Sequence, residues 1–280
     1  MTPEEYNEES ADRFGWSPED LGLEDEASDS DIVAAVKEFQ QEQGLTVDGK
    51  VGPMTWGRLQ TYNEYRRISE GNNHILLNGE YVEVDFPCVP VAAGSEFSLI
   101  GQGGYSNRRY DPHQVVWHWD AALSAKSTHK ILLKRNLSYH GVIDNDGTFV
   151  QFLDFDDHAA WHAGRGFNSR SIGISLSNGV YTKYQDYYEK RWGARPVITA
   201  TVHGNEHTLL GYYPAQLETA ARIAAFIEET FDIPLNYPTT DTVLEDAKDF
   251  EGHLAHYHCT TRKWDVAGFP FQQVMEEASK

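Results

Sequence analysis

The sequence predicts an α/β domain, a mixed sheet flanked by helices, preceded by a small all-helical domain. Apolar runs of strand length, such as 115–119 and 172–176, alternate with polar turns and lead into one long amphipathic segment at 214–231. Upstream, residues 31–59 show helical spacing interrupted by glycine and proline. The predicted organisation is an acidic, partly packed arm at 1–30, a helical domain at 31–65 or from about residue 10, a linker and hairpin at 66–112, and the α/β domain at 113–280.

The helical domain is predicted from a face of apolar residues. Ile32, Val36 and Phe39 lie one helical turn apart, and Gly44 is placed to end that helix. Asp-Gly and Gly-Pro pairs follow as a turn and a break, and a second helix is expected from Thr55.

The α/β domain is predicted element by element. Asn78-Gly79 marks a hairpin turn between two apolar strands. Four further strands are expected at 115–119, 139–144, 148–153 and 172–176. A helix at 214–231 should bury Leu217, Ala220, Ala221, Ala224 and Ile227. The intervening insertion, 181–213, is rich in tyrosine. It is expected to stack on sugar rings and set substrate selectivity, with a packed subdomain as the alternative.

Composition excludes two classes of function. With 43 Asp and Glu against 23 Lys and Arg, the net charge of −20 argues against a nucleic-acid partner, because phosphate binding needs a basic surface. No apolar run approaches the roughly 18–20 residues that span a bilayer, so no membrane insertion is expected.

The ends and the cysteines indicate where the protein is made. Met1–Glu9 carries four glutamates and no apolar core, unlike a secretory signal peptide. Two cysteines, Cys88 and Cys259, are too few for a disulfide framework. We therefore expect the protein to be made in the cytoplasm without a signal peptide. We also expect it to be a monomer.

One stretch near the end of the chain concentrates metal-binding side chains. Residues 252–265 hold three histidines, a cysteine, a lysine and an aspartate. Imidazole, thiolate and carboxylate are the groups that bind zinc, and a catalytic site uses three of them and leaves one position open. A local cluster should supply two ligands, and His118, at the end of an apolar run, could supply the third. A polar surface loop is the alternative.

The helical domain resembles a small peptidoglycan-binding module. The resemblance rests on Phe39-Gln40, Gly44-Leu45, Val47-Asp48-Gly49, Val51-Gly52-Pro53, Thr55-Trp56 and Leu59. It implies peptidoglycan as a partner, with a ligand-free helical cap as the alternative.

The α/β domain resembles the zinc-dependent N-acetylmuramoyl-L-alanine amidases, whose fold is shared with peptidoglycan recognition proteins. The resemblance rests on Val116-Trp117-His118, Ser138–Asp144 with Asp146-Gly147-Thr148, Ala160–Gly164, Asn168–Ile174, and Gly252-His253 with Arg262–Asp265. It implies a Zn²⁺ ion bound by His118, His253 and Asp265, with Cys259 as the alternative third ligand.

The same resemblance assigns roles around the metal. Lys263 would stabilise the oxyanion, and Tyr139 would hydrogen-bond the attacking water or that oxyanion. Some relatives have a glutamate where this chain has Ser175, so proton transfer would rest on Tyr139, the metal-activated water or Asp265. Substrate contacts are implied for Trp161, His162 and Asn168, although a core role for the histidine and a turn role for the asparagine are open alternatives.

The expected function is hydrolysis of the amide between N-acetylmuramic acid and L-alanine in peptidoglycan. The protein would then be a phage or prophage endolysin, or a delivered cell-wall-degrading effector, that acts on the wall or in the periplasm after release or delivery. The alternative is a receptor or virion wall-docking protein that binds peptidoglycan without cleaving it. A peptide-bond metalloprotease is disfavoured because the chain lacks a His-Glu-x-x-His helix.

Overall fold

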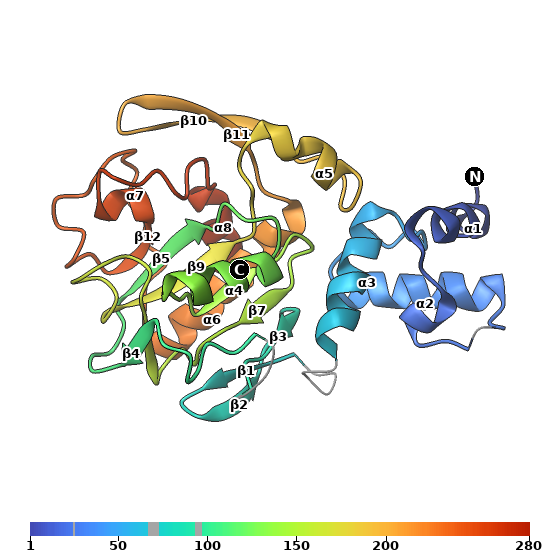
Figure 1. The fold of residues 1–280 in the computed structure, drawn as a ribbon, viewed down its shortest axis with the longest axis horizontal. Helices are drawn as coiled ribbons and strands as arrows, with labels where there is room; N and C mark the ends of the chain where they lie inside the picture. The colour runs from blue at the N-terminus through green and yellow to red at the C-terminus, as the bar shows by residue number, and fades with distance from the viewer. Residues whose placement is uncertain (25, 67–72, 93–96) are drawn as a thin grey trace.

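A helical domain and a larger α/β domain make up the computed structural model, which describes residues 1–24, 26–66, 73–92 and 97–280, without the side chains of 60–66 (Figure 1). The helical domain contains α1 Pro3–Phe14, a 3₁₀ turn at Pro18–Leu21, α2 Asp29–Glu42 and α3 Pro53–Arg66. Its core consists of Trp16, Val36, Phe39, Val51, Trp56 and Leu59. The predicted apolar face of α2 is therefore the face that packs.

Two amide side chains organise the loop between α2 and α3. Gln40 donates from Nε2 to Asp48 Oδ1 and Thr55 Oγ1, and its Oε1 accepts from the backbone of Asp48 and Gly49. Asn7 donates to the Gly49 carbonyl and accepts from the Val51 N–H. Residues 3–14, which lie in the predicted acidic arm, therefore form a helix that is fastened to this loop.

The α/β domain is built on a six-stranded mixed sheet, which confirms the predicted fold class. Its strand order is β12 Gly252–Ala255, β5 Gln114–Trp119, β9 Ser171–Leu176, β6 Gly141–Ile143, β7 Phe149–Gln151 and β3 Cys88–Val89. The first four strands run parallel, β7 is antiparallel to β6, and β3 is parallel to β7. All four strands predicted for this part of the chain are present.

The two faces of the sheet have different partners, because successive side chains of a strand point to opposite faces. On one face Val115 and Trp117 of β5 pack in the main core with α6, Pro214–Phe231, and α8, Phe271–Ala278. On the other face α4, Ala125–Arg135, packs over β6 and β7. His118 of β5 points to this second face, as does Val116 two residues before it.

Smaller elements surround the sheet. They are the hairpins β1 His74–Leu77 with β2 Glu80–Glu83 and β10 Val197–Val202 with β11 Asn205–Leu210, the pair β4 Tyr105–Asn107 with β8 His158–Ala160, and the short helices at Thr182–Tyr184, α5 Gln185–Glu189 and α7 His256–Cys259. Asn78 and Gly79 form the predicted hairpin turn with φ of 51° and 74°. Of the predicted linker at 66–112, positions 67–72 and 93–96 lie outside the described residues.

The helical domain packs against the α/β domain through α3. Trp192 lies so close to Gly57 that a Cβ there would be 1.8 Å from the indole Cδ1. Arg58, which is 1% exposed, enters the α/β domain beside Gly147, and burial lowers its pKa although the Asp146 carboxylate acts against that shift. Small residues thus allow close contact between the two domains.

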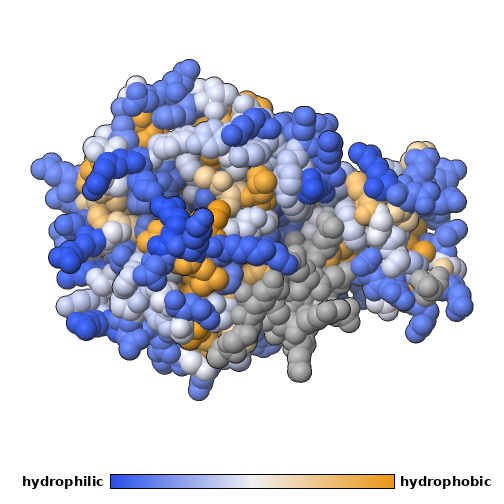
Figure 2. All heavy atoms as spheres, in the orientation of Figure 1, coloured by the Kyte–Doolittle hydropathy of each residue, from blue (hydrophilic) through white to orange (hydrophobic). Residues whose placement is uncertain are grey.

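The face of the molecule shown in Figure 2 is largely hydrophilic, with apolar residues in small separate areas. Among the described residues, no helix combines the length and hydrophobicity needed to cross a bilayer.

Candidate active site

Three buried side chains converge at the C-terminal end of β5. Asp265 Oδ2 lies 2.9 Å from His118 Nδ1 and 2.9 Å from His256 Nδ1. Each residue offers one atom that could bind a metal, and these three atoms lie within 4.8 Å of one another. His118 is the second-to-last residue of the central strand β5, His256 begins α7, and Asp265 follows in the next loop, so the sheet and the α7 loop together fix the group.

The chemistry of this group fits zinc. Zinc binds histidine nitrogen and carboxylate oxygen at about 2.0–2.2 Å in tetrahedral geometry, which separates ligand atoms by roughly 3.3–3.5 Å. Burial, with His256 adding to it, lowers the pKa of His118 to about 4. Burial alone would raise the pKa of Asp265, but the neighbouring histidines hold it below its usual value. Neutral imidazoles and an ionised carboxylate are the forms that bind a metal.

His253, expected as the second ligand, does not join this group. It aligns with Val115 in the parallel register of β12 and β5, so its side chain lies on the face opposite His118. There its Nδ1 accepts a hydrogen bond of 3.0 Å from Trp117 Nε1, and its ring stacks on that indole with 6.0 Å between centroids. The structure therefore brings His256, and not the predicted His253, next to His118 and Asp265.

A signal for His256 was present in the sequence. The separation between His253 and Asp265 is longer than the resembled family prefers, and His256 stands three residues closer to the aspartate. Cys259, the alternative third ligand, is absent from the group. Burial, followed by the charge of Asp265, raises the pKa of its thiol to about 12, so it remains protonated at neutral pH.

Tyr139 and Ser175 adjoin the same group. The rings of Tyr139 and His118 lie 4.9 Å apart between centroids. Burial and the nearby Asp265 carboxylate raise the pKa of the phenol above its usual value, so it acts as a hydrogen-bond donor. Ser175 is opposite His118 in the β5–β9 register and is fully buried. No carboxylate stands at that position.

Lys263 belongs to a loop that the β10–β11 hairpin supports. His203 Nε2 lies 2.9 Å from the Lys263 carbonyl oxygen. His207 stacks on Trp264 with 4.4 Å between centroids and 19° between planes. Lys263 is exposed, and its charge is close enough to oppose protonation of His118. The predicted aromatic insertion thus contacts the segment that carries Lys263 and Asp265.

Of the predicted substrate-contacting residues, His162 contacts His118 on the ring nitrogen that does not face Asp265. His162 Nδ1 is 2.9 Å from His118 Nε2. Asn168 Oδ1 accepts from the backbone N–H of His162 and Ala163, which fixes the start of this loop. Trp161 is 37% exposed. The ring of His162 has room because position 173 is glycine, where a Cβ would lie 2.6 Å from its Cγ.

The fold and this site define a class of protein with a mixed α/β sheet and a buried His-His-Asp group that could hold a metal ion. The family model for N-acetylmuramoyl-L-alanine amidases matches residues 108–268, and a model described as a putative peptidoglycan-binding domain matches residues 12–59. Because the first match spans more than half of the chain, the chain belongs to the N-acetylmuramoyl-L-alanine amidase family. This confirms both resemblances found in the sequence.

The solved structures to which this chain is similar include amidases and endolysins. A selenomethionine AmpD derivative is 21% identical with a TM-score of 0.42, and covers 72% of this chain and 98% of its own. AmiD from Escherichia coli is 19% identical with a TM-score of 0.40, and covers 73% and 65%. The Ph2119 endolysin from a Thermus scotoductus bacteriophage is 14% identical with a TM-score of 0.39, and covers 64% and 92%. No curated protein matched the chain.

Proposed function

We propose that this amidase acts with a zinc ion held by His118, His256 and Asp265, and that it hydrolyses the amide between N-acetylmuramic acid and L-alanine. One observation carries the proposal: three ligand-type atoms lie within 4.8 Å of one another in the segment matched by the amidase family. Bound zinc would supply a Lewis acid and lower the pKa of a coordinated water.

The protein's own groups supply the rest of the chemistry. The protonated phenol of Tyr139 donates a hydrogen bond to the substrate carbonyl oxygen as negative charge develops there. The ammonium group of Lys263 stabilises the same charge through space. Because Ser175 stands where some relatives have a glutamate, the proton that the attacking water loses and the leaving amine gains would pass through Asp265, Tyr139 or the water itself.

Substrate contacts follow from the rim of the site. Trp161 offers an exposed ring against which a sugar can stack, and the next residue, His162, contacts His118. Asn168 holds the backbone of His162 and Ala163 in place, and Ser138 Oγ accepts from the backbone N–H of Trp161. The helical domain binds the wall, and it packs on the catalytic domain through Gly57 and Arg58.

An endolysin or a delivered effector is the setting we propose for this enzyme. The pairing of a peptidoglycan-binding domain with an amidase domain supports it. Added to cells whose outer barrier has been permeabilised, the purified protein should lower the turbidity of the culture. Intact cells under those conditions would refute the lytic role.

The activity is tested by digesting purified peptidoglycan with zinc-loaded protein and identifying the products by mass spectrometry. Free stem peptides with L-alanine at the N-terminus are expected. They should disappear after chelation, return when zinc is restored, and be absent for Asp265→Ala. Undigested peptidoglycan that still pulls down the protein would refute the enzyme and leave a receptor.

A further inference from the structure

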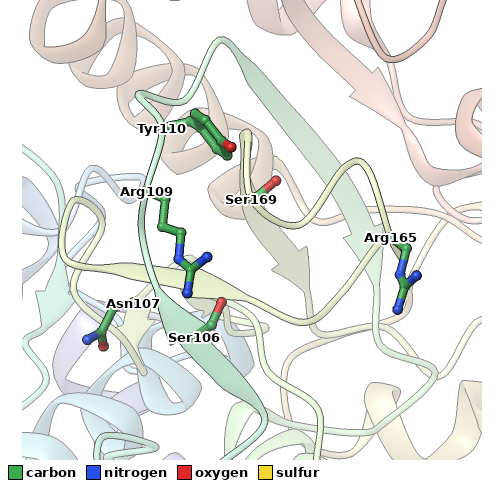
Figure 3. Close-up of a pocket in the computed structure, with 6 residues that line it drawn as sticks. All are labelled: Ser106, Asn107, Arg109, Tyr110, Arg165 and Ser169. Carbon is green, nitrogen blue, oxygen red and sulfur yellow. The ribbon is translucent and has the colours of Figure 1, made fainter.

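A second hollow lies on the surface next to the site just described. It has a volume of about 780 Å³ and is lined by Ser106, Asn107, Arg109, Tyr110, Arg165 and Ser169. One wall comes from β4 and the residues after it, and the other from the loop between β8 and β9. Arg109 and Arg165 stand on opposite sides of it (Figure 3).

The charge of this hollow is unusual for the chain. Acidic residues outnumber basic ones by 43 to 23 overall, yet two arginines line the hollow and Arg170 lies over the Tyr110 ring at 5.4 Å. Among the described residues, none of these three arginines takes part in an ion pair. The lining side chains include no carboxylate; the adjacent Asp111 acts on the buried Arg108 instead.

The hollow lies close to the candidate active site along two paired strands. β4 pairs with β8, and β8 leads directly into Trp161 and His162. Arg165 follows His162 by three residues, which limits the distance between their Cα atoms to about 11 Å. The Asn168 side chain fastens the beginning of this loop. A peptide extending from the scissile amide therefore reaches the hollow within a few residues.

Guanidinium groups select the kind of ligand. Arginine presents donors in a planar fork that pairs with a carboxylate through two charge-assisted hydrogen bonds. The hydroxyls of Ser106 and Ser169 and the amide of Asn107 add neutral hydrogen-bonding groups. The stem peptide of peptidoglycan carries free carboxylates close to its L-alanine end. These can be amidated without a change in length, which makes the pairing testable.

We propose that this hollow binds a free carboxylate of the stem peptide and that Arg109 and Arg165 make the enzyme selective for stems in which that carboxylate is not amidated. The proposal rests on the amidase function above and adds a specificity subsite to it. Teichoic acid phosphates are the other anions of the wall, and the experiment separates them.

The test uses two soluble muramyl peptides that differ only in having a free or an amidated carboxylate on the second residue. Wild-type enzyme should cleave the free form with a kcat/KM at least about tenfold higher, mainly through KM. The Arg109→Gln, Arg165→Gln double variant should lose this preference and cleave the amidated form at the wild-type rate. Arg13→Gln with Arg191→Gln removes two charges elsewhere and should keep the preference.

A binding measurement makes the result independent of catalysis. Calorimetric titration with the released stem peptide should give weaker binding for the amidated peptide and for the double variant. Equal treatment of both peptides by wild type, or an unchanged preference in the double variant, overturns the proposal. Loss of binding to purified teichoic acid in the double variant, with stem-peptide binding unchanged, also overturns it. Failure to cleave either muramyl peptide refutes the proposed function, and the titration still decides the subsite.

Discussion

Replacing His253 and His256 by alanine, one at a time, separates a structural histidine from a proposed metal ligand. The substitutions are identical and three positions apart in sequence. His253 is fully buried and accepts the indole hydrogen bond of Trp117. Its removal leaves that N–H unpaired, at about 1–3 kcal/mol, and opens a cavity. Together we expect a loss of about 3–5 kcal/mol in the free energy of unfolding.

The expected zinc contents run in the opposite direction. His256→Ala deletes one of three ligands and should weaken zinc binding by more than about 100-fold, since even the loss of outer contacts costs 10–100-fold. Folded His253→Ala should still bind one equivalent. Urea unfolding of the metal-free proteins measures stability, and elemental analysis after dialysis measures zinc. Loss of zinc from His253→Ala together with normal zinc in His256→Ala would refute the reasoning.

Three further predictions concern neighbouring features. Gly173→Ala should push the His162 ring aside, which should cost about 1–3 kcal/mol of stability and lower kcat. Urea unfolding measures the stability and initial rates measure kcat. An unchanged kcat would contradict this prediction. Burial lowers the pKa of His140 to about 3, so the unfolded state binds its proton first: stability should hold above about pH 6.5 and fall as the pH drops from there toward 3. His140→Asn should flatten that decline in urea titrations at several pH values, and an equally steep decline argues against this histidine as the cause. His207→Ala should reduce kcat more than KM by releasing Trp264, whereas the conservative His207→Phe should restore the rate; equal rates in all three proteins would exclude a positioning role.

The sequence predicted the sheet and the long helix well because their signals are local. Alternating or continuous apolar runs give a strand or a helix wherever they occur, and α6 begins and ends at the predicted residues, Pro214 and Phe231. The choice between His253 and His256 was different. It depends on which residues of β12 lie on the same sheet face as His118. That is set by the pairing register with β5, a tertiary property that spacing along one segment does not contain.

The same limit applies to contacts between distant segments. His162 was identified from its motif. Its 2.9 Å approach to His118, however, requires that position 173, on another strand, be a glycine without a side chain. Arg109 and Arg165 lie 56 residues apart in sequence and come to one hollow only through the pairing of β4 with β8. Single motifs are visible in a sequence, whereas the distances between them require the fold.

The packing of α3 onto the α/β domain has a consequence for building chimeras. Wall-binding domains are natural units to exchange when an enzyme is redirected to another bacterium. Here a junction placed after α3 would expose the indole of Trp192 and leave Asp146 without the charge of Arg58. Because Trp56 and Leu59 of α3 also belong to the core of the helical domain, a junction before α3 would open that core in turn. A chimera should therefore keep the whole helical domain with the catalytic portion and add the foreign domain N-terminal to it, so that the added part brings only new recognition.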